Sequence, residues 1–192
     1  MEAYWYFDFA SPFAYLQLAK AREWRSRLPV KPVPIAARAL PKMDGDGDAP
    51  TPGMGESLER FIRWRAKAAG VALTFPPTYP FNSFAALRLC VAAGNSWQAI
   101  ETIFAHLWRD GRDGMLPEEL RALGAPLGLP DAVVALGSPD HAATVRANTL
   151  AAIALGVTSV PTIRVGGQLF SGSTGADRLD EWLAQPAMLR SA

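Results

Sequence analysis

The chain has 192 residues, of which 49% are hydrophobic, and this composition predicts one well-packed globular unit, or such a unit with a large insertion, and excludes a disordered chain. Its 19 basic and 18 acidic residues give a net charge of +1, so the sequence has no electrostatic footprint for nucleic acid or for an anionic membrane surface. We therefore expect the partner to be a small molecule or a second copy of the chain.

Cysteine and histidine usage narrows the chemistry further. The single cysteine, Cys90, cannot form an internal disulfide, and its apolar neighbours predict a buried structural thiol. The two histidines, His106 and His141, have no partners at ligand spacing, so we expect no metal site. The first predicted strand leaves no room for a signal peptide, and no apolar stretch reaches the roughly 18 residues of a membrane span. We expect a cytoplasmic enzyme.

The first predicted element is a strand at residues 4–9, Y-W-Y-F-D-F, whose aromatic run fits a strand buried on both faces. Ser11 and Pro12 then predict the start of a helix at 12–25, because a serine oxygen caps free N–H groups and proline tolerates the first helical position. The Ser11 hydroxyl would lie at the positive end of this helix, where a thiolate is stabilised. A plain N-cap is the alternative interpretation.

The middle of the chain reads as helix and loop. Val30 to Ile35 contains two prolines, which places this strand at a sheet edge. The stretch 44–55, D-G-D-G-D-A-P-T-P-G-M-G, predicts a loop and lacks the glutamate that a calcium loop needs at its twelfth position. Helical periodicity, prolines and glycines predict six helices, at 57–69, 84–93, 96–110, 117–123, 130–136 and 139–155.

Sheet character returns at residues 160–165, V-P-T-I-R-V, followed by a Gly166-Gly167 turn, a strand at 168–170 and a final helix at 177–183. Because a lone hairpin is marginal in water, the front and back strands must pair. The prediction is an α/β fold with a βαβ–ββα core from residues 1–39 and 156–192. Residues 40–155 would form an inserted all-helical domain.

The segment 7–16, F-D-F-A-S-P-F-A-Y-L, resembles the N-terminus of 2-hydroxychromene-2-carboxylate isomerases and kappa-class glutathione transferases. These form the serine branch of the thioredoxin-like proteins of the disulfide-oxidoreductase A type, whose C-P-x-C motif reads S-P-F-A here. With Ser11 and Ala14 at the cysteine positions, thiol–disulfide exchange at this site is excluded. The resemblance implies a thioredoxin-like fold with a helical insertion, glutathione as cofactor and a small aromatic 2-oxo acid as substrate.

Two later segments add to the resemblance. G-V-T-S-V-P-T at 156–162 looks like the family segment that carries a cis-proline, so we expect a cis Val160–Pro161 bond that leaves the N–H and C=O of Val160 open to pair with the cysteinyl backbone of glutathione. A simple proline at the start of a strand is the alternative.

The segment 172–179, G-S-T-G-A-D-R-L, is similar to the family segment that holds the γ-glutamyl end of glutathione. The glutathione-binding residues that it implies are Gly172, Ser173, Ala176, Asp177 and Arg178. An ordinary loop, with Asp177 as the cap of the last helix, is the alternative. For the substrate, the resemblance points to Lys42 and Asn82, which could equally be a solvated surface charge and a helix cap.

The residues and the resemblance together favour a glutathione-dependent isomerase. Ser11 would donate a hydrogen bond to the sulfur of glutathione, and no neighbouring base could activate it as a nucleophile. By resemblance, the reaction interconverts 2-hydroxychromene-2-carboxylate and trans-o-hydroxybenzylidenepyruvate through reversible thiolate addition. A kappa-class-like transferase and a binding module without activity are the alternatives. The resemblance also implies a homodimer, in keeping with six tryptophans and many apolar helix faces.

Overall fold

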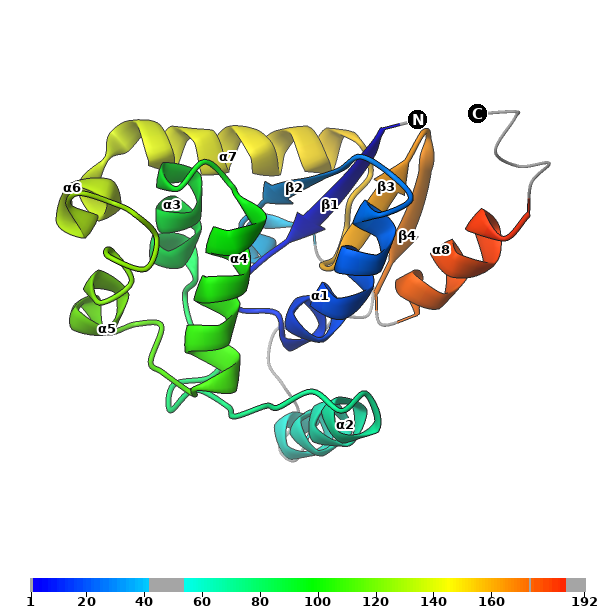
Figure 1. Cartoon of the computed structure of the whole chain (residues 1–192), viewed down its shortest axis with the longest axis horizontal. Coiled ribbons are helices and arrows are strands. Elements are labelled where there is room, and N and C mark those ends of the chain that lie inside the picture. Colours follow the sequence, from blue (N-terminus) through cyan, green and yellow to red (C-terminus); the bar gives the residue numbers. More distant parts are fainter. Residues whose placement is uncertain (1, 42–53, 173, 186–192) are drawn as a thin grey trace.

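The computed structural model describes residues 2–41, 54–172 and 174–185, and its four strands form one sheet in the order β2–β1–β3–β4 (Figure 1). The central strand β1 (Ala3–Phe7) runs parallel to β2 (Val30–Pro34) and antiparallel to β3 (Thr162–Val165). β3 pairs antiparallel with β4 (Gln168–Ser171). Strand β2, which contains two prolines, lies at the edge of the sheet, as predicted. Proline has no backbone N–H, so it cannot complete the hydrogen bonds of a strand that is paired on both sides.

Successive side chains of β1 enter two different cores, since residues alternate between the faces of a strand. Trp5 and Phe7 are fully buried in the larger core, with residues of α1 (Pro12–Arg25) and of the helices that follow. Tyr6 faces the other side and packs in a smaller cluster with Ile35 and Ala152. Helix α7 (Pro139–Ala154) therefore covers one face of the sheet, and α1 lies on the other (Figure 1).

Helices make up the regular structure between the strands at the front and the hairpin at the back. In chain order they are a 3₁₀ turn η1 (Ala37–Ala39), α2 (Met54–Ala68), α3 (Phe84–Ala92), α4 (Trp97–Phe104), a π-helix η2 (Ala105–Arg109), α5 (Pro117–Arg121), α6 (Ala132–Gly137) and α7, and α8 (Gly175–Leu183) follows the hairpin. No strand occurs in the described part of residues 40–155. The described ranges contain no helix that is both long and apolar enough to cross a membrane.

The helical range and the sheet share one core. The Phe104 ring of α4 lies 4.7 Å from the Phe9 ring, and the Trp108 indole N–H of η2 donates to the Phe9 carbonyl oxygen at 2.7 Å. All three aromatic side chains are fully buried. The chain just before Ser11 is therefore held by residues about a hundred positions further along.

Three predicted helix starts differ by two or three residues from those of the structure. Helix α6 begins at Ala132 and not at Pro130, because the Asp131 side chain caps it and accepts from the N–H groups of the next two residues of the helix. Helix α8 begins at Gly175 with Thr174 in the cap position, so Asp177 lies inside the first turn and is not the cap. Helix α2 begins at Met54, three residues before its expected start, and the remaining predicted helices begin within one residue of theirs.

Candidate functional site

Ser11 occupies the N-cap of α1, as predicted. Its backbone is extended, with φ −92° and ψ 110°, and its Oγ accepts from the Ala14 N–H at 3.2 Å. The same hydroxyl group lies 3.5 Å from the Val160 carbonyl oxygen, at the long limit of a hydrogen bond. The hydroxyl therefore sits at the positive end of the helix, and its proton is only weakly held.

The segment that faces Ser11 is the start of the hairpin. The Val160–Pro161 peptide bond is cis, which confirms the prediction. The Gly172 N–H donates to the Pro161 carbonyl oxygen at 3.0 Å, and Gly172 has φ +76°, a conformation that favours glycine. One expectation needs correction: the Val160 carbonyl oxygen is not fully open, because the Ser11 hydroxyl lies within reach of it.

A cleft of about 180 Å³ lies beside this pair of segments. Three parts of the chain line it: one face of α1, the second half of α2 with the residue that follows it, and the hairpin with the first turn of α8. The lining residues are Phe13, Leu16, Gln17, Lys20, Arg65, Ala69, Pro161, Gly172, Ala176 and Asp177.

The structure brings half of the eight predicted glutathione-binding residues to the lining of this cleft. Gly172, Ala176 and Asp177 line it together with Pro161. Val160 and Ser11 are not among the lining residues, but Val160 directly precedes Pro161 and Ser11 lies two residues before Phe13. Arg178 is exposed on α8 and is not among the lining residues. Ser173 lies outside the described residues.

The two predicted substrate residues are not brought together in the described structure. Asn82 does not line the cleft, and its Oδ1 accepts from the Phe84 N–H at 3.1 Å, at the start of α3. Ser83 holds the N-cap position of that helix, so Asn82 makes a polar contact just before the helix and is not its cap. Lys42 lies outside the described residues.

Sequence reasoning missed the polar residues that α1 and α2 present to the cleft. The i, i+3, i+4, i+7 spacing of one helix face holds Phe13, Leu16, Gln17 and Lys20. The sequence therefore already indicated that these four side chains share one face of the helix. It did not show that this face meets α8. Arg65 lies on α2 and lines the cleft beside α1, and this proximity depends on how the two helices pack.

A buried carboxylate supports the turn that precedes Ser11. Asp8 is 1% exposed, and its two oxygens accept from the N–H groups of Ala10 at 2.9 Å and Ala37 at 2.7 Å. Burial raises the pKa of Asp8 above its ordinary value, and these hydrogen bonds oppose the shift. The carboxylate therefore joins the end of β1 to the turn after β2 and fixes the backbone that leads into α1.

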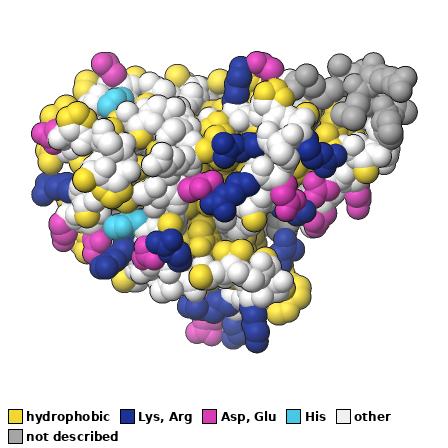
Figure 2. Space-filling view, viewed as in Figure 1, with side chains coloured by type: hydrophobic (Ala, Val, Ile, Leu, Met, Phe, Trp, Pro, Cys, Tyr) yellow, Lys and Arg dark blue, Asp and Glu magenta, His cyan; other side chains and the backbone are white. Residues whose placement is uncertain are grey.

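The surface around these elements carries charges of both signs. Figure 2 shows Lys and Arg side chains interspersed with Asp and Glu side chains on one face of the molecule, in keeping with the net charge of +1.

Comparisons with known proteins agree with this fold. The chain is 29% identical over 187 residues to the 2-hydroxychromene-2-carboxylate isomerase of Sphingobium xenophagum, covering 93% of this chain and 95% of that protein. A solved 2-hydroxychromene-2-carboxylate isomerase has the same fold, with a TM-score of 0.81 and 23% identity over 100% of this chain and 98% of its own. A probable DsbA oxidoreductase of Streptomyces coelicolor superposes with a TM-score of 0.76 and 19% identity, over 100% and 91% of the two chains.

The model of the DSBA-like thioredoxin domain matches residues 4–184, which include the described helices and, apart from Ala3, the four strands. Within that frame, serine and alanine stand where the oxidoreductases of this type carry their two cysteines, and the one free thiol, Cys90, is buried in the core. The chain therefore belongs to the family of DSBA-like thioredoxin domains.

Proposed function

We propose that the protein is a glutathione-dependent isomerase that interconverts 2-hydroxychromene-2-carboxylate and trans-o-hydroxybenzylidenepyruvate. The observation that carries the proposal is the pairing of the Ser11 hydroxyl, at the start of α1, with the Val160–Pro161 segment beside a charged cleft. The sequence similarity to an isomerase over nearly the whole chain supports it.

The charges of the cleft fit glutathione. The lining contains two cationic side chains, Lys20 and Arg65, and one carboxylate, Asp177. Glutathione carries two carboxylates and one ammonium, which is the complementary set. Backbone groups of Val160 at the edge of the cleft are suited to pairing with an extended peptide, as in strand addition. The residues present therefore match the cofactor that the sequence implies.

When bound, glutathione supplies a thiolate that adds to the conjugated double bond of the substrate, permits rotation about that bond and leaves again, so none is consumed. The chain's part is to ionise and orient the thiol. A hydrogen bond from Ser11 and the N-terminus of α1 would lower the pKa of the thiol from about 8.5 to about 7. Ser11 acts as a donor, because its Oγ has no base among its described contacts.

Aromatic side chains next to the cleft suit an aromatic substrate. Phe13 lines the cleft two residues after Ser11, and its ring centroid lies 6.3 Å from that of Phe61 on α2. Phe61 stacks in turn on Trp64, with centroids 5.9 Å apart. Phe61 is 42% exposed and Trp64 is 61% exposed, so both rings offer a face to a ligand.

The test combines binding with turnover. Calorimetric titration should detect glutathione binding, and absorbance should show interconversion of the two isomers only when glutathione is present. Titration of free thiol after many turnovers separates the candidates, since an isomerase leaves the thiol count unchanged and a transferase lowers it in proportion to product. Turnover without glutathione, or no binding of it, would refute the proposal.

A further inference from the structure

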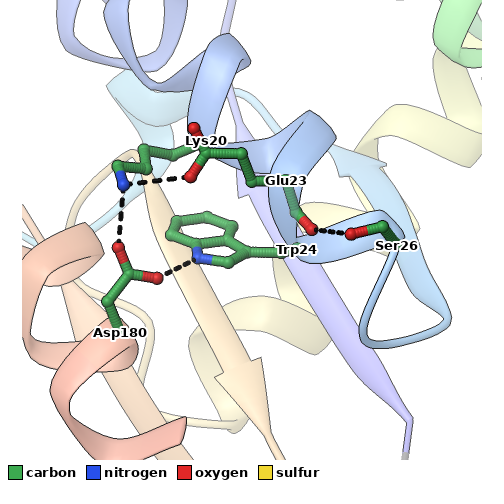
Figure 3. Close-up of polar contacts among 5 residues, drawn as sticks. All are labelled: Lys20, Glu23, Trp24, Ser26 and Asp180. Atoms are coloured by element: carbon green, nitrogen blue, oxygen red, sulfur yellow. Dashed lines mark hydrogen bonds and ion pairs between the residues drawn. The ribbon is translucent and has the colours of Figure 1, made fainter. Parts of the chain in front are cut away.

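Lys20 stands where α1 and α8 meet at the cleft. Its Nζ lies 3.0 Å from Glu23 Oε2 on its own helix and 3.0 Å from Asp180 Oδ2 on α8 (Figure 3). The other oxygen of Asp180 accepts from the indole N–H of Trp24 at 2.8 Å, and Trp24 is fully buried. The ammonium group is therefore positioned by a carboxylate that is itself fixed to the core.

This arrangement leaves Lys20 able to bind a ligand. An ammonium has three N–H donors, and Glu23 and Asp180 occupy two of them. The side chain is 42% exposed, and it lines the cleft. Hydrogen bonds to Glu23 and Asp180 raise the pKa of Lys20, so the group is charged at neutral pH.

A second donor lies one turn earlier on the same face of α1. Gln17 is 6% exposed and lines the cleft, and its Oε1 accepts from the Trp5 indole N–H at 2.7 Å in the core. Among the described residues its Nε2 has no partner, and this atom is not fully enclosed by protein. With the oxygen held by the core, the amide N–H₂ is the end of the side chain that a ligand can reach.

An acceptor faces these donors from α8. Asp177 lines the cleft and precedes Asp180 by three residues, so both carboxylates lie on the same side of their helix. Asp180 binds Lys20, and Asp177, about one turn earlier on α8, lines the same cleft as Lys20. The cleft therefore offers one carboxylate, one ammonium and one amide donor.

The family resemblance already implies that Asp177 holds the γ-glutamyl end of glutathione, where its carboxylate would meet the α-ammonium. We propose that Lys20 and Gln17 bind the α-carboxylate of the same γ-glutamyl residue. Within glutathione only the γ-glutamyl α-carbon carries both charges, whereas the glycyl end carries a carboxylate alone. The inference rests on the proposed function, because it takes glutathione as the ligand, and it makes Lys20 a specificity-determining residue.

The test crosses Lys20→Met with two glutathione analogues in calorimetric titrations. Replacing the γ-glutamyl group by 4-aminobutyryl removes only the α-carboxylate, and replacing it by glutaryl removes only the α-ammonium. Lys20→Met should weaken glutathione and the glutaryl analogue about tenfold, as expected for one partly exposed charge-assisted hydrogen bond. It should leave the already weaker 4-aminobutyryl analogue unchanged.

Arg22→Met is the matched control. Arg22 lies on the same helix and is also paired with a carboxylate, Glu101, but it does not line this cleft, so glutathione affinity should stay the same. The inference is overturned if Lys20→Met weakens all three ligands equally or none of them, or if the wild type binds the 4-aminobutyryl analogue as tightly as glutathione. A wild type that binds no glutathione instead overturns the proposed function itself.

Discussion

The role of the Ser11 hydroxyl is tested most directly by Ser11→Ala. This change removes two things at once, the N-cap of α1 and the donor that would face the sulfur of glutathione. Loss of an N-cap lowers the free energy of unfolding by about 1 kcal/mol. Loss of the donor acts on the cofactor instead, and the two effects can be separated because one is seen in unfolding and the other in the pH dependence of turnover.

The size of the second effect follows from the contacts of Ser11. Its Oγ lies 3.5 Å from the Val160 carbonyl oxygen, so the hydrogen bond between them is weak. Little stabilisation is therefore lost when the hydroxyl turns to donate to a thiolate. A hydrogen bond to a charged group contributes about 1.5–3 kcal/mol. Since 1.36 kcal/mol corresponds to one unit of pKa, Ser11→Ala should raise the pKa of the bound thiol by about one to two.

The assay is a pH–rate profile at saturating glutathione. Below the thiol pKa, turnover of Ser11→Ala should fall about ten- to a hundredfold, because the rate follows the thiolate fraction. At higher pH, where the thiol ionises unaided, the variant should approach the wild-type rate. Glutathione affinity should change little.

Ser96→Ala is the matched control for the lost cap. Ser96 Oγ accepts from the Ala99 N–H at 3.2 Å, which matches the contact of Ser11 with Ala14, but it caps α4 and does not line the cleft. The control should lose about the same stability, about 1 kcal/mol, and keep the wild-type pH profile. An unchanged profile in Ser11→Ala, or a shifted one in Ser96→Ala, would refute the reasoning.

Three further predictions concern the surroundings of the site. Phe61→Ala should raise KM for the aromatic substrate several-fold, because the ring is 42% exposed beside the cleft. Glutathione affinity should stay unchanged, and an equal weakening of substrate and glutathione binding would contradict a substrate-facing role. Gly175→Ala should lower the free energy of unfolding by about 1–3 kcal/mol in urea denaturation, because its Cβ would lie 2.7 Å from the Phe170 carbonyl oxygen. Gly137→Ala, whose Cβ would meet nothing within 4 Å, should not be destabilising, and similar losses in both variants would count against the close contact. Burial raises the pKa of Asp8 above 3.8, so its contribution to stability is fully present below that value and is lost as pH rises through the raised pKa. The stability of the wild type relative to Asp8→Asn should therefore fall between about pH 4 and the raised pKa, and a pH-independent difference in denaturation experiments would exclude this.

Elements with local signals could be predicted from the sequence. Ser11 and Pro12 mark the start of α1, and the turn at Gly166 and Gly167 marks the hairpin, because caps and tight turns depend on neighbouring residues alone. The start of α6 was missed because Pro130 and Asp131 are adjacent start signals, and the pattern does not choose between them. The close approach of Gly175 to β4 depends on tertiary packing, which no local pattern shows.

The same distinction applies to the site. Local motifs single out Ser11, Pro161 and Asp177 as candidate site residues, and Pro161 and Asp177 do line the cleft. The roles proposed for Gln17 and Lys20 depend instead on which helix lies opposite them. Periodicity shows that such residues share a face but not what lies opposite. The homodimer, the cytoplasmic location, the glutathione dependence and the roles of Lys42 and Ser173 stay predictions.

The position of β1 at the centre of the sheet has a consequence for synthesis on the ribosome. Its neighbour β2 follows at once, but β3 and the Val160 carbonyl come much later, and Ser11 and Val160 stand 149 positions apart. At typical translation speeds one edge of β1 stays unpaired for on the order of ten seconds. An open strand edge is a template for pairing with other chains, so this interval is when the nascent protein is most prone to aggregate. A chain interrupted before β3 would contain Ser11 and its helix, yet it would have no cleft, because every residue that faces them from the hairpin and α8 would be missing.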